Sequence, residues 1–283
     1  MKKSVTVATA CYERDWRLIL SEGYLSRVFS GFNYQFDRKI LIINTTQNKD
    51  EITKAALREV SLGNIDDFYF TEELKDEVMR YFSIKDFIYT DVFSLFKKGF
   101  DVSLIKRFYH FYFRKKGKSK IVSLRKKQYD CYDYSISPLC AIYKADSDYL
   151  LYFTEDCAMA ENSNGRWIED AVSILDNDQR IIAGRPIDED LDANYFDEYD
   201  NIDNFYVSYM FTDRMFLANV NAMKKVDYNC EDQRKYPPYG GAGFEARVYN
   251  YMATNNKFMI ISHNERFIHE DEDYLDGISI SNF

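Results

Sequence analysis

The chain has 283 residues, of which 46% are hydrophobic and 17% aromatic, and its formal net charge is −9 at pH 7. This hydrophobic content excludes an intrinsically disordered chain, and the length is sufficient for one large α/β domain or two small ones. The apolar runs are too short for a transmembrane helix, and no signal-peptide core follows Met1, so we expect a cytoplasmic protein.

The first quarter of the chain predicts alternating strands and helices. β-prone runs at 4–10, 39–46 and 67–70 alternate with helical patterns at 16–29 and 51–60. The connections between them are short, which favours parallel strands joined by right-handed crossovers. This order is typical of the nucleotide-binding half of a doubly wound sheet.

Residues 72–130 interrupt this pattern with helical, aromatic and basic sequence that looks inserted. Twelve Lys or Arg against a single acid give +11 within 97–127, so the remainder carries −20. Aromatic side chains accompany these cations, which predicts a peripheral contact of 97–127 with an anionic membrane on its inner face. A solvated basic helix with its aromatics packed inward is the alternative. Single-stranded nucleic acid would attract the same residue types, but we expect no stable nucleic-acid partner.

An apolar run at 148–153 ends abruptly in Thr154, Glu155 and Asp156, and a predicted helix at 134–145 leads into it. The run is continuous rather than alternating, which is typical of a central strand covered on both faces. In open α/β sheets, ligands bind beyond the carboxyl ends of strands. Glu155 and Asp156 are therefore placed to hold a hard cation and a phosphate.

The remainder of the chain gives weaker signals. In order, they predict a helix at 166–175, a strand at 180–184, an acidic loop at 188–203, mixed signals at 205–223, a turn-rich segment at 237–243, a helix at 244–255, and short strands at 257–262 and 267–268. No internal repeat or low-complexity linker occurs, so one domain of two halves is favoured.

Four short motifs, taken in order, carry a resemblance to a known family. They are Val-Thr-Val-Ala-Thr-Ala-Cys-Tyr-Glu-Arg at 5–14, a strand ending at Asn44, Thr-Glu-Asp at 154–156 and Gly-Gly-Ala-Gly-Phe-Glu at 240–245. In this order they resemble GT-A fold glycosyltransferases, closest to the family two type that uses nucleotide-diphosphate sugars. The resemblance implies an α/β fold with a Rossmann-type, mostly parallel sheet flanked by helices, and with a helical insert.

The same resemblance implies how one domain, 1–283, divides by function. The nucleotide-binding half would comprise 1–71 and 131–160, the basic and aromatic insert 72–130, and the acceptor-binding and catalytic half 161–283.

The resemblance also implies a nucleotide-binding edge. The residues that it places on the nucleotide are Thr9, Ala10, Tyr12, Glu13, Arg14, Asn44, Thr154 and Glu155. Glu13 would accept from ribose hydroxyls, and Arg14 would reach a phosphate or the base. Asn44 stands where the family usually has an Asp, so the base preference stays open. An ordinary strand-to-helix connection with a solvated ion pair is the alternative for Glu13 and Arg14.

In the family, an Asp-x-Asp motif binds Mn or Mg, which bridges the two phosphates. Its two positions fall on Thr154 and Asp156, and only the second is acidic. Asp156 is therefore the implied metal ligand, with Glu155 as a neighbouring or ribose contact. His269 lies near the C-terminus, where many GT-A enzymes supply a further ligand. A solvated acidic turn and an ordinary surface histidine are the alternatives.

Glu245 is the candidate catalytic base. An inverting transfer needs a base on the side of the sugar opposite the leaving phosphate. The family places that carboxylate at the start of a helix after a flexible turn, as the glycines of 240–243 and Glu245 are placed here. An acid in the first turn also stabilises a helix through its dipole, so a structural role is the alternative.

Taken together, the resemblance implies a hexosyl- or related glycosyltransferase. It would move a sugar from a nucleotide-diphosphate sugar to a glycan or lipid-linked acceptor, with inversion, in cell-surface polysaccharide synthesis. A sugar nucleotidyltransferase is one alternative, although 9–14 lacks the glycine-rich phosphate loop expected there. A non-catalytic carbohydrate- or nucleic-acid-binding protein is the other, because Thr154 replaces an expected acid.

Overall fold

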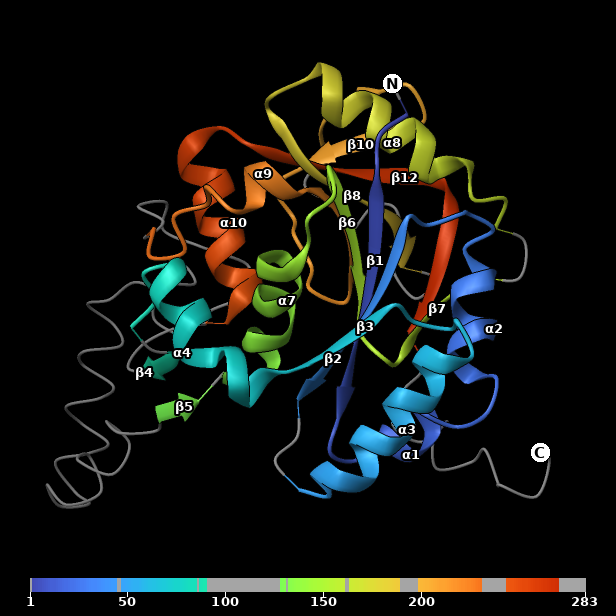
Figure 1. Cartoon of the computed structure of the whole chain (residues 1–283). Coiled ribbons are helices and arrows are strands. Elements are labelled where there is room, and N and C mark those ends of the chain that lie inside the picture. Colours follow the sequence, from blue (N-terminus) through green and yellow to red (C-terminus); the bar gives the residue numbers. More distant parts are fainter. Residues whose placement is uncertain are drawn as a thin grey trace, which may run out of the picture.

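A ten-stranded mixed sheet forms the centre of the fold (Figure 1). The computed structural model describes residues 2–44, 47–85, 87–90, 128–130, 132–160, 163–188, 198–230 and 243–269. The strand order is β3-β2-β1-β6-β11-β8-β12-β10-β9, with β7 beside β12. Its strands are β1 (Val5–Tyr12), β2 (Arg38–Asn44), β3 (Asp67–Phe70), β6 (Tyr149–Phe153), β7 (Cys157–Met159), β8 (Ile181–Asp188), β9 (Glu198–Ile202), β10 (Phe205–Ser208), β11 (Met215–Asn219) and β12 (Phe258–His269).

Most strands of this sheet run in one direction. β3, β2, β1 and β6 are parallel neighbours, as are β8 and β12. Within the described sheet, only β7, β10 and β11 run the other way. The predicted α/β class with a mostly parallel sheet is confirmed, and the antiparallel β11 between β6 and β8 was not foreseen.

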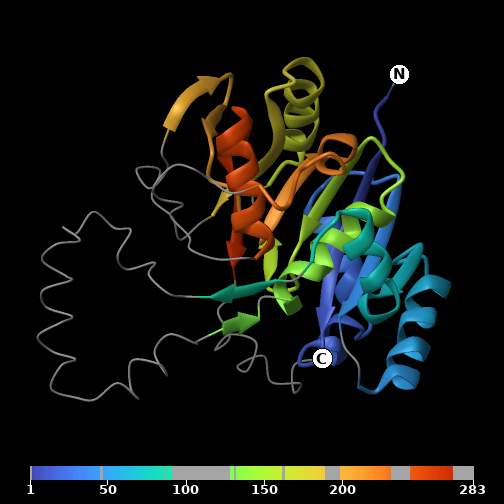
Figure 2. The same cartoon turned by 90° about the vertical axis from the view of Figure 1, so that its left-hand side faces the viewer.

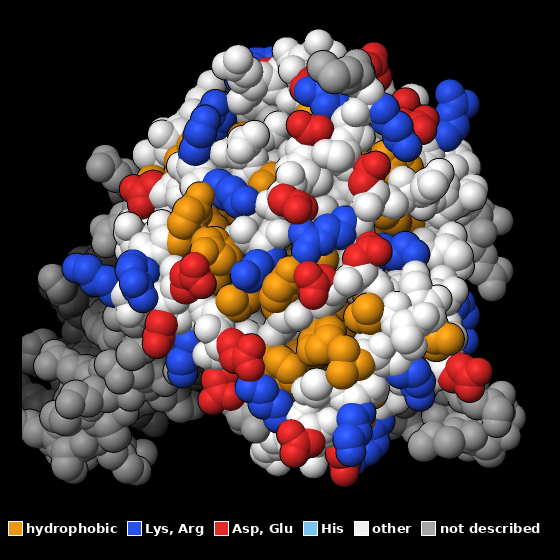
Figure 3. Space-filling model, viewed as in Figure 1, with side chains coloured by type: hydrophobic (Ala, Val, Ile, Leu, Met, Phe, Trp, Pro, Cys, Tyr) orange, Lys and Arg blue, Asp and Glu red, His pale blue; other side chains and the backbone are white. Residues whose placement is uncertain are grey.

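Helices cover both faces of the sheet. They are α1 (Trp16–Ile19), α2 (Tyr24–Gly31), α3 (Lys49–Ser61) and α8 (Arg166–Asn177) on one face, and α4 (Thr71–Tyr81), α7 (Tyr132–Lys144), α9 (Val220–Met223) and α10 (Phe244–Asn255) on the other. Figure 1 shows α4, α7 and α10 on one side of β1, with α2 and α3 on the other. On the face seen in Figure 3, acidic and basic side chains of the described residues are interspersed around a hydrophobic area over β3.

β6 is the central strand that the apolar run predicts. All five of its residues are buried. Tyr149, Leu151 and Phe153 belong to the hydrophobic core beneath α2 and α8, whereas Leu150 and Tyr152 belong to the core beneath α7 and α10. Because both faces are covered, a continuous apolar sequence is the pattern that the position requires.

The start of the chain departs from the prediction in two ways. β1 continues to Tyr12, two residues beyond the predicted strand end. The predicted helix at 16–29 is two helices, α1 and α2, separated at Gly23, whose φ of 78° lies in the left-handed region. Glycine adopts this backbone conformation without strain, and a helix cannot continue through it.

The second half contains strands that the sequence did not predict. β7 directly follows the turn after β6, and the predicted acidic loop at 188–203 contains β9. The two late strands at 257–262 and 267–268 are a single strand, β12, whose pairing with β8 is interrupted between Ile261 and Arg266. The polar residues of this interruption break the hydrophobic pattern, so the sequence predicted two strands.

The predicted insert begins with α4 and continues into a two-stranded antiparallel sheet. β4 (Ile88–Thr90) pairs with β5 (Gln128–Asp130), as Figure 2 shows beside α10. The basic segment 97–127 lies outside the described residues, so its membrane contact stays a prediction, as does the functional division of the domain. Among the described helices, none is long and apolar enough to cross a bilayer.

Candidate active site

The carboxyl ends of β1, β2, β6 and β8 meet at one edge of the sheet, because these strands run in the same direction. β11 runs the other way, so the segment before Met215 reaches the same edge. A backbone hydrogen bond joins two of these segments, since Thr154 N donates to Arg214 O at 2.8 Å. The edge therefore combines strand ends predicted from the sequence with a turn that was not.

Asp156 lies in the tight turn between β6 and β7, where neighbouring side chains fix its carboxylate. Thr154 Oγ1 donates to Asp156 Oδ1 at 2.5 Å, and Cys157 Sγ lies 3.6 Å from the same oxygen. Burial raises the pKa of the Cys157 thiol, which keeps it protonated and able to donate. Thr154, at the motif position where an acid was expected, thus orients Asp156.

Glu245 lies in the first turn of α10 and interacts electrostatically with Asp213 and Arg214 of the turn before β11. Phe244 N donates to Ser135 Oγ of α7 at 3.0 Å, which anchors the first turn of the helix. The Glu245 side chain is half-buried. Burial, and next the charge of Asp213, raise the pKa of Glu245 to about 8, against the opposing effect of Arg214 and Arg185.

Asp213 is electrostatically coupled to acids on two different elements. Burial raises its pKa to about 6, with a further contribution from Asp156 and an opposing one from Arg214. It also raises the pKa of Glu245. Two like charges in a half-buried site do not ionise independently, so Asp213 and Glu245 titrate as a pair. This carboxyl pair holds a proton near neutral pH, which is the range that suits general acid–base chemistry.

Arginines balance the carboxyl pair. Arg214 Nη1 lies 3.2 Å from Asp188 Oδ2; the Asp188 side chain is 3% exposed, whereas that of Arg214 is 46% exposed. The buried acid therefore holds an arginine whose remaining donors face solvent. Arg185, on the same strand as Asp188, is buried and lowers the pKa of Glu245. The edge thus offers both anionic and cationic groups to a ligand.

Glu155 points into the protein beside this edge. Its Oε2 is buried and has no hydrogen-bond partner among the described residues. Burial, and next the charge of Asp156, raise the pKa of Glu155 well above its ordinary value. Its backbone carbonyl accepts from Tyr24 Oη at 3.1 Å. Its predicted contact with the nucleotide or ribose stays a prediction.

Only part of the predicted nucleotide-binding turn lies at the end of β1. Thr9 and Ala10 were expected in the turn, but β1 continues through both and buries their side chains. Tyr12 is the last residue of the strand and pairs with Asn44, the last residue of β2. Burial, and next the charge of Glu155, raise the pKa of Tyr12.

Glu13 and its neighbours tie the first two loops together. Glu13 accepts from Gln47 N and from Asn48 Nδ2, at 3.2 Å each. Arg14 Nε donates to Asp15 Oδ1 at 3.2 Å and leaves most of its side chain exposed. Asn44 Oδ1 accepts from Thr71 Oγ1 at 2.8 Å. The predicted roles of Glu13, Arg14 and Asn44 on the nucleotide stay predictions.

The predicted metal ligands are Asp156, in the turn before β7, and His269, at the end of the neighbouring strand β12. The backbone of His269 pairs with Cys157, one residue from Asp156. The side chain of His269 lies outside the described residues. Among the described residues, no three His, Cys, Asp or Glu side chains converge on a common point that would hold a metal ion. The described part of the chain therefore supplies Asp156 but not a complete set of ligands.

The pKa of Glu245 predicts how stability depends on pH. In the folded protein this carboxyl releases its proton near pH 8, whereas its ordinary pKa is 4.5. The folded state therefore holds a proton that the unfolded state has lost, so stability falls as pH rises from 4.5 to 8. The Glu245→Gln variant has no carboxyl at this position, so its stability does not fall in this way. At pH 8.5 we expect its free energy of unfolding to be higher than that of the wild type by on the order of 2 kcal/mol.

Urea titrations at pH 5 and pH 8.5 measure this difference. The gain should be much smaller at pH 5, because the folded wild type is protonated at this position and pH 5 lies only slightly above the ordinary pKa of 4.5 that applies to the unfolded state. A gain of equal size at both pH values would show that the pKa of Glu245 is not raised.

Sequence reasoning missed Asp213, Arg214, Asp188 and Arg185. Asp213 and Arg214 directly precede the apolar run of β11, and Asp188 ends β8. A charged pair before an apolar strand is the signal that was available at Asp213 and Arg214. It points to a sheet edge only if that strand is antiparallel to its neighbours, which the sequence did not indicate.

Proteins similar to this chain are found among solved structures. No family model and no curated protein sequence matches it. Among solved structures, it is similar to GalNAc-T7 with UDP, GalNAc and Mn²⁺, at 12% identity and a TM-score of 0.49, covering 95% of this chain and 44% of that one. It is also similar to residues 1–349 of Staphylococcus aureus TarS, at 10% identity and a TM-score of 0.44, covering 96% and 62%.

A third similar structure is the galactosyltransferase LgtC in complex with donor and acceptor sugar analogues. The identity is 13%, the TM-score 0.39, and the match covers 87% of this chain and 70% of that one. The chain thus spans less than half of GalNAc-T7 and under two thirds of the TarS fragment. At these identities and TM-scores, the likeness carries no conclusion about the activity of the chain.

Proposed function

We propose that the chain is a glycosyltransferase that moves a sugar from a nucleotide-diphosphate sugar to a hydroxyl acceptor with inversion. The observation that carries this proposal is the coupled carboxyl pair of Glu245 and Asp213 at the carboxyl edge of the sheet, beside the exposed guanidinium of Arg214. A base with a pKa near neutrality and a cation for a departing phosphate are the two groups that such a transfer requires.

In the proposed reaction, Glu245 accepts the proton of the acceptor hydroxyl. The acceptor oxygen forms a bond to the anomeric carbon, and the bond from that carbon to the phosphate oxygen breaks, so its electron pair leaves with the nucleoside diphosphate. Asp213 raises the basicity of Glu245 through its negative charge. The proton that Glu245 gains restores the protonated form that burial favours.

Arg214 is placed to stabilise the negative charge that develops on the leaving diphosphate. Asp188 anchors one of its nitrogens at 3.2 Å, and nearly half of the side chain remains exposed. An arginine held in this way presents its other donors in a fixed direction, which suits a phosphate. Asp156, fixed by Thr154, is the proposed ligand for Mn or Mg, with His269 on the adjacent strand. When bound, the ion neutralises charge on the diphosphate.

The finer assignments are part of the proposal. Tyr12, Glu13, Arg14 and Asn44 would contact the nucleoside, because they surround the ends of β1 and β2. The sugar would be a hexose or a relative, and the acceptor a glycan or lipid-linked glycan of cell-surface polysaccharide synthesis. The protein would work in the cytoplasm, with 97–127 on the membrane surface.

A thermal-shift screen of nucleoside diphosphates, with and without Mn²⁺, tests the proposal. We expect uridine, guanosine or cytidine diphosphate to raise the melting temperature, because binding to the folded state alone stabilises it. A ligand at a hundred times its Kd stabilises by about 2.7 kcal/mol, a shift that is readily measured. The shift should require Mn²⁺ and should be lost in Asp156→Asn.

The control variant is Asp176→Asn, at an exposed acid near the end of α8. It should retain the full shift. If no nucleotide produces a shift in the wild type, the transferase proposal fails and a non-catalytic binding protein is favoured. A shift that Asp156→Asn leaves unchanged would remove Asp156 from the proposed metal site.

A further inference from the structure

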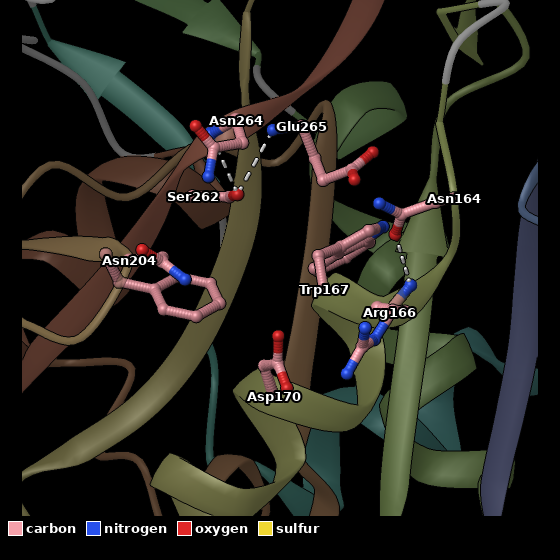
Figure 4. Close-up of a pocket in the computed structure, with 9 residues that line it drawn as sticks. Asn164, Arg166, Trp167, Asp170, Asn204, Ser262, Asn264 and Glu265 are labelled. Atoms are coloured by element: carbon pink, nitrogen blue, oxygen red, sulfur yellow. Dashed lines mark hydrogen bonds between the residues drawn. The ribbon is translucent and has the colours of Figure 1, made fainter.

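A cavity of about 260 Å³ lies on the face of the sheet opposite α10. It is formed by the start of α8, the start of β10 and the interruption of β12 (Figure 4). Trp167 and Phe205 of its lining belong to the core beneath α8, whereas Phe244 beside Glu245 belongs to the core beneath α10. The cavity is therefore separate from the candidate active site.

The interruption of β12 opens this cavity. Between Ile261 and Arg266 the strand loses its register with β8. Ser262 Oγ holds the irregular segment by accepting from Asn264 N at 3.4 Å and from Glu265 N at 3.2 Å, and Figure 4 shows both bonds. Bulges of this kind redirect side chains out of the regular alternation of a strand. Here the interruption turns polar side chains toward the cavity.

One buried polar group in the lining lacks a partner among the described residues. Trp167 is 2% exposed, and its indole N–H has no acceptor in the described part of the chain. Glu265 is 7% exposed and also lines the cavity. A buried donor without a partner is costly. The cost is relieved when a ligand in the cavity supplies an acceptor for the indole N–H.

The rest of the lining identifies the chemistry of that ligand. Three amides, Asn164, Asn204 and Asn264, can each donate and accept, and Asp170 adds a further acceptor. In the view of Figure 4, Trp167 lies in the middle of the group, with its ring nitrogen on the side of Asn164. Closely spaced donors and acceptors around an aromatic ring suit a ligand with many hydroxyl groups.

The charge and size of the cavity further restrict the class of ligand that it can bind. Two carboxylates and one guanidinium, that of Arg166, disfavour a phosphate. The volume is slightly below the roughly 300 Å³ at which pockets for drug-sized ligands begin, so the ligand is small. We propose that this cavity binds a single saccharide ring of a glycan, at a site distinct from the carboxyl edge of the sheet.

Trp167 itself can report the binding. The chain has two tryptophans, Trp16 and Trp167, so Trp16→Phe leaves Trp167 as the only indole. The probes are glucose, galactose, N-acetylglucosamine and N-acetylgalactosamine, each titrated to tens of millimolar while Trp167 fluorescence is recorded. At least one should produce a saturable change with a Kd in the millimolar range. Glu265→Gln in the same background should weaken this binding about tenfold, because a charged acceptor is replaced by a neutral one.

The matched control is Glu169→Gln, at an exposed acid on α8 that does not line the cavity. It should leave the Kd unchanged, and circular dichroism establishes that each variant is folded. The proposal is overturned if no saccharide produces a saturable change, or if Glu265→Gln and Glu169→Gln have equal Kd values. It is also overturned if tetramethylammonium displaces the sugar, because the site would then be one for organic cations.

Saccharide binding in this cavity can be tested independently of the proposed transferase activity. Glu245→Gln should bind the saccharide as the parent does, and nucleoside diphosphates should not displace it. Saccharide binding without any nucleotide-dependent thermal shift would leave this cavity as a sugar site on a protein that is not a transferase. Nucleotide binding without saccharide binding would overturn only the inference about the cavity.

Discussion

Glu245→Gln should lower the rate of sugar transfer by about 10²–10⁴-fold, the usual contribution of a general base. The amide retains the shape of the carboxyl but cannot take the acceptor proton near neutral pH. Nucleotide binding should persist, because Glu245 lies on α10, whereas the proposed nucleoside contacts lie at the ends of β1 and β2. Turnover is measured as nucleoside diphosphate released from a panel of nucleotide sugars, and binding as the thermal shift with the diphosphate.

The pH dependence of the wild-type rate adds a second readout. The base must be ionised, so turnover should rise with pH, reach half of its limit near pH 8 and level off above it, where Glu245 has lost its proton. Because Asp213 is coupled to Glu245, the profile reports apparent values of the pair.

Glu51→Gln is the matched control. Glu51 is an exposed acid in the first turn of α3, a helix of 13 residues, as Glu245 is an acid in the first turn of α10, a helix of 12 residues. The Glu51→Gln variant tests how much an acid in the first turn of a helix contributes to stability. This contribution is below about 1 kcal/mol at exposed positions. Unchanged turnover in Glu245→Gln would exclude it as the base. Loss of nucleotide binding along with turnover would show that its role is structural.

Phe216→Ala should destabilise the protein by about 3–5 kcal/mol, a large share of the 5–15 kcal/mol that is typical of a domain. Phe216 lies on β11 and is fully buried. Its ring stacks on Tyr152 of β6 at 5.3 Å between centroids and contacts Phe211 at 5.1 Å and Phe244 at 5.8 Å. Alanine leaves a cavity among these rings, because partners on three elements cannot all collapse into it.

The same substitution should also lower turnover, because Phe244 directly precedes Glu245 and packs on Phe216. Urea unfolding measures the loss of stability, and turnover is compared below the unfolding transition. Phe216→Leu retains most of the volume and should cost about 1–2 kcal/mol with little loss of rate. If Phe216→Ala costs less than Phe216→Leu, or leaves turnover unchanged, the aromatic cluster does not position Glu245.

The sequence alone predicted those elements whose hydrophobic pattern is set by their local burial. β6 has one apolar run because both its faces are covered, and α10 begins directly after Gly243, as predicted. It failed where tertiary contacts override the local pattern. β12 continues through four polar residues because it pairs with β8 both before and after this interruption, and Gly23 divides a helix that its apolar spacing would continue.

In the candidate site, too, some residues could be predicted from local sequence and others could not. Asp156 and Glu245 follow from local signals, an acidic strand end and an acid after a glycine turn. Asp213 and Arg214 gain their meaning only from the antiparallel direction of β11, which brings the turn before this strand against Thr154 and α10. The direction of a strand depends on long-range pairing, and no single segment of sequence records it.

The pairing of β4 with β5 has a consequence for how the fold tolerates change. Ile88 is opposite Asp130, so the two points of the fold that flank 91–127 are neighbours. The connection between them, 91–127, can be lengthened or shortened at a cost that grows only with the logarithm of its length, about 0.6 kcal/mol for each doubling. A change in the length of this connection is therefore expected to preserve the register of β1 with β6.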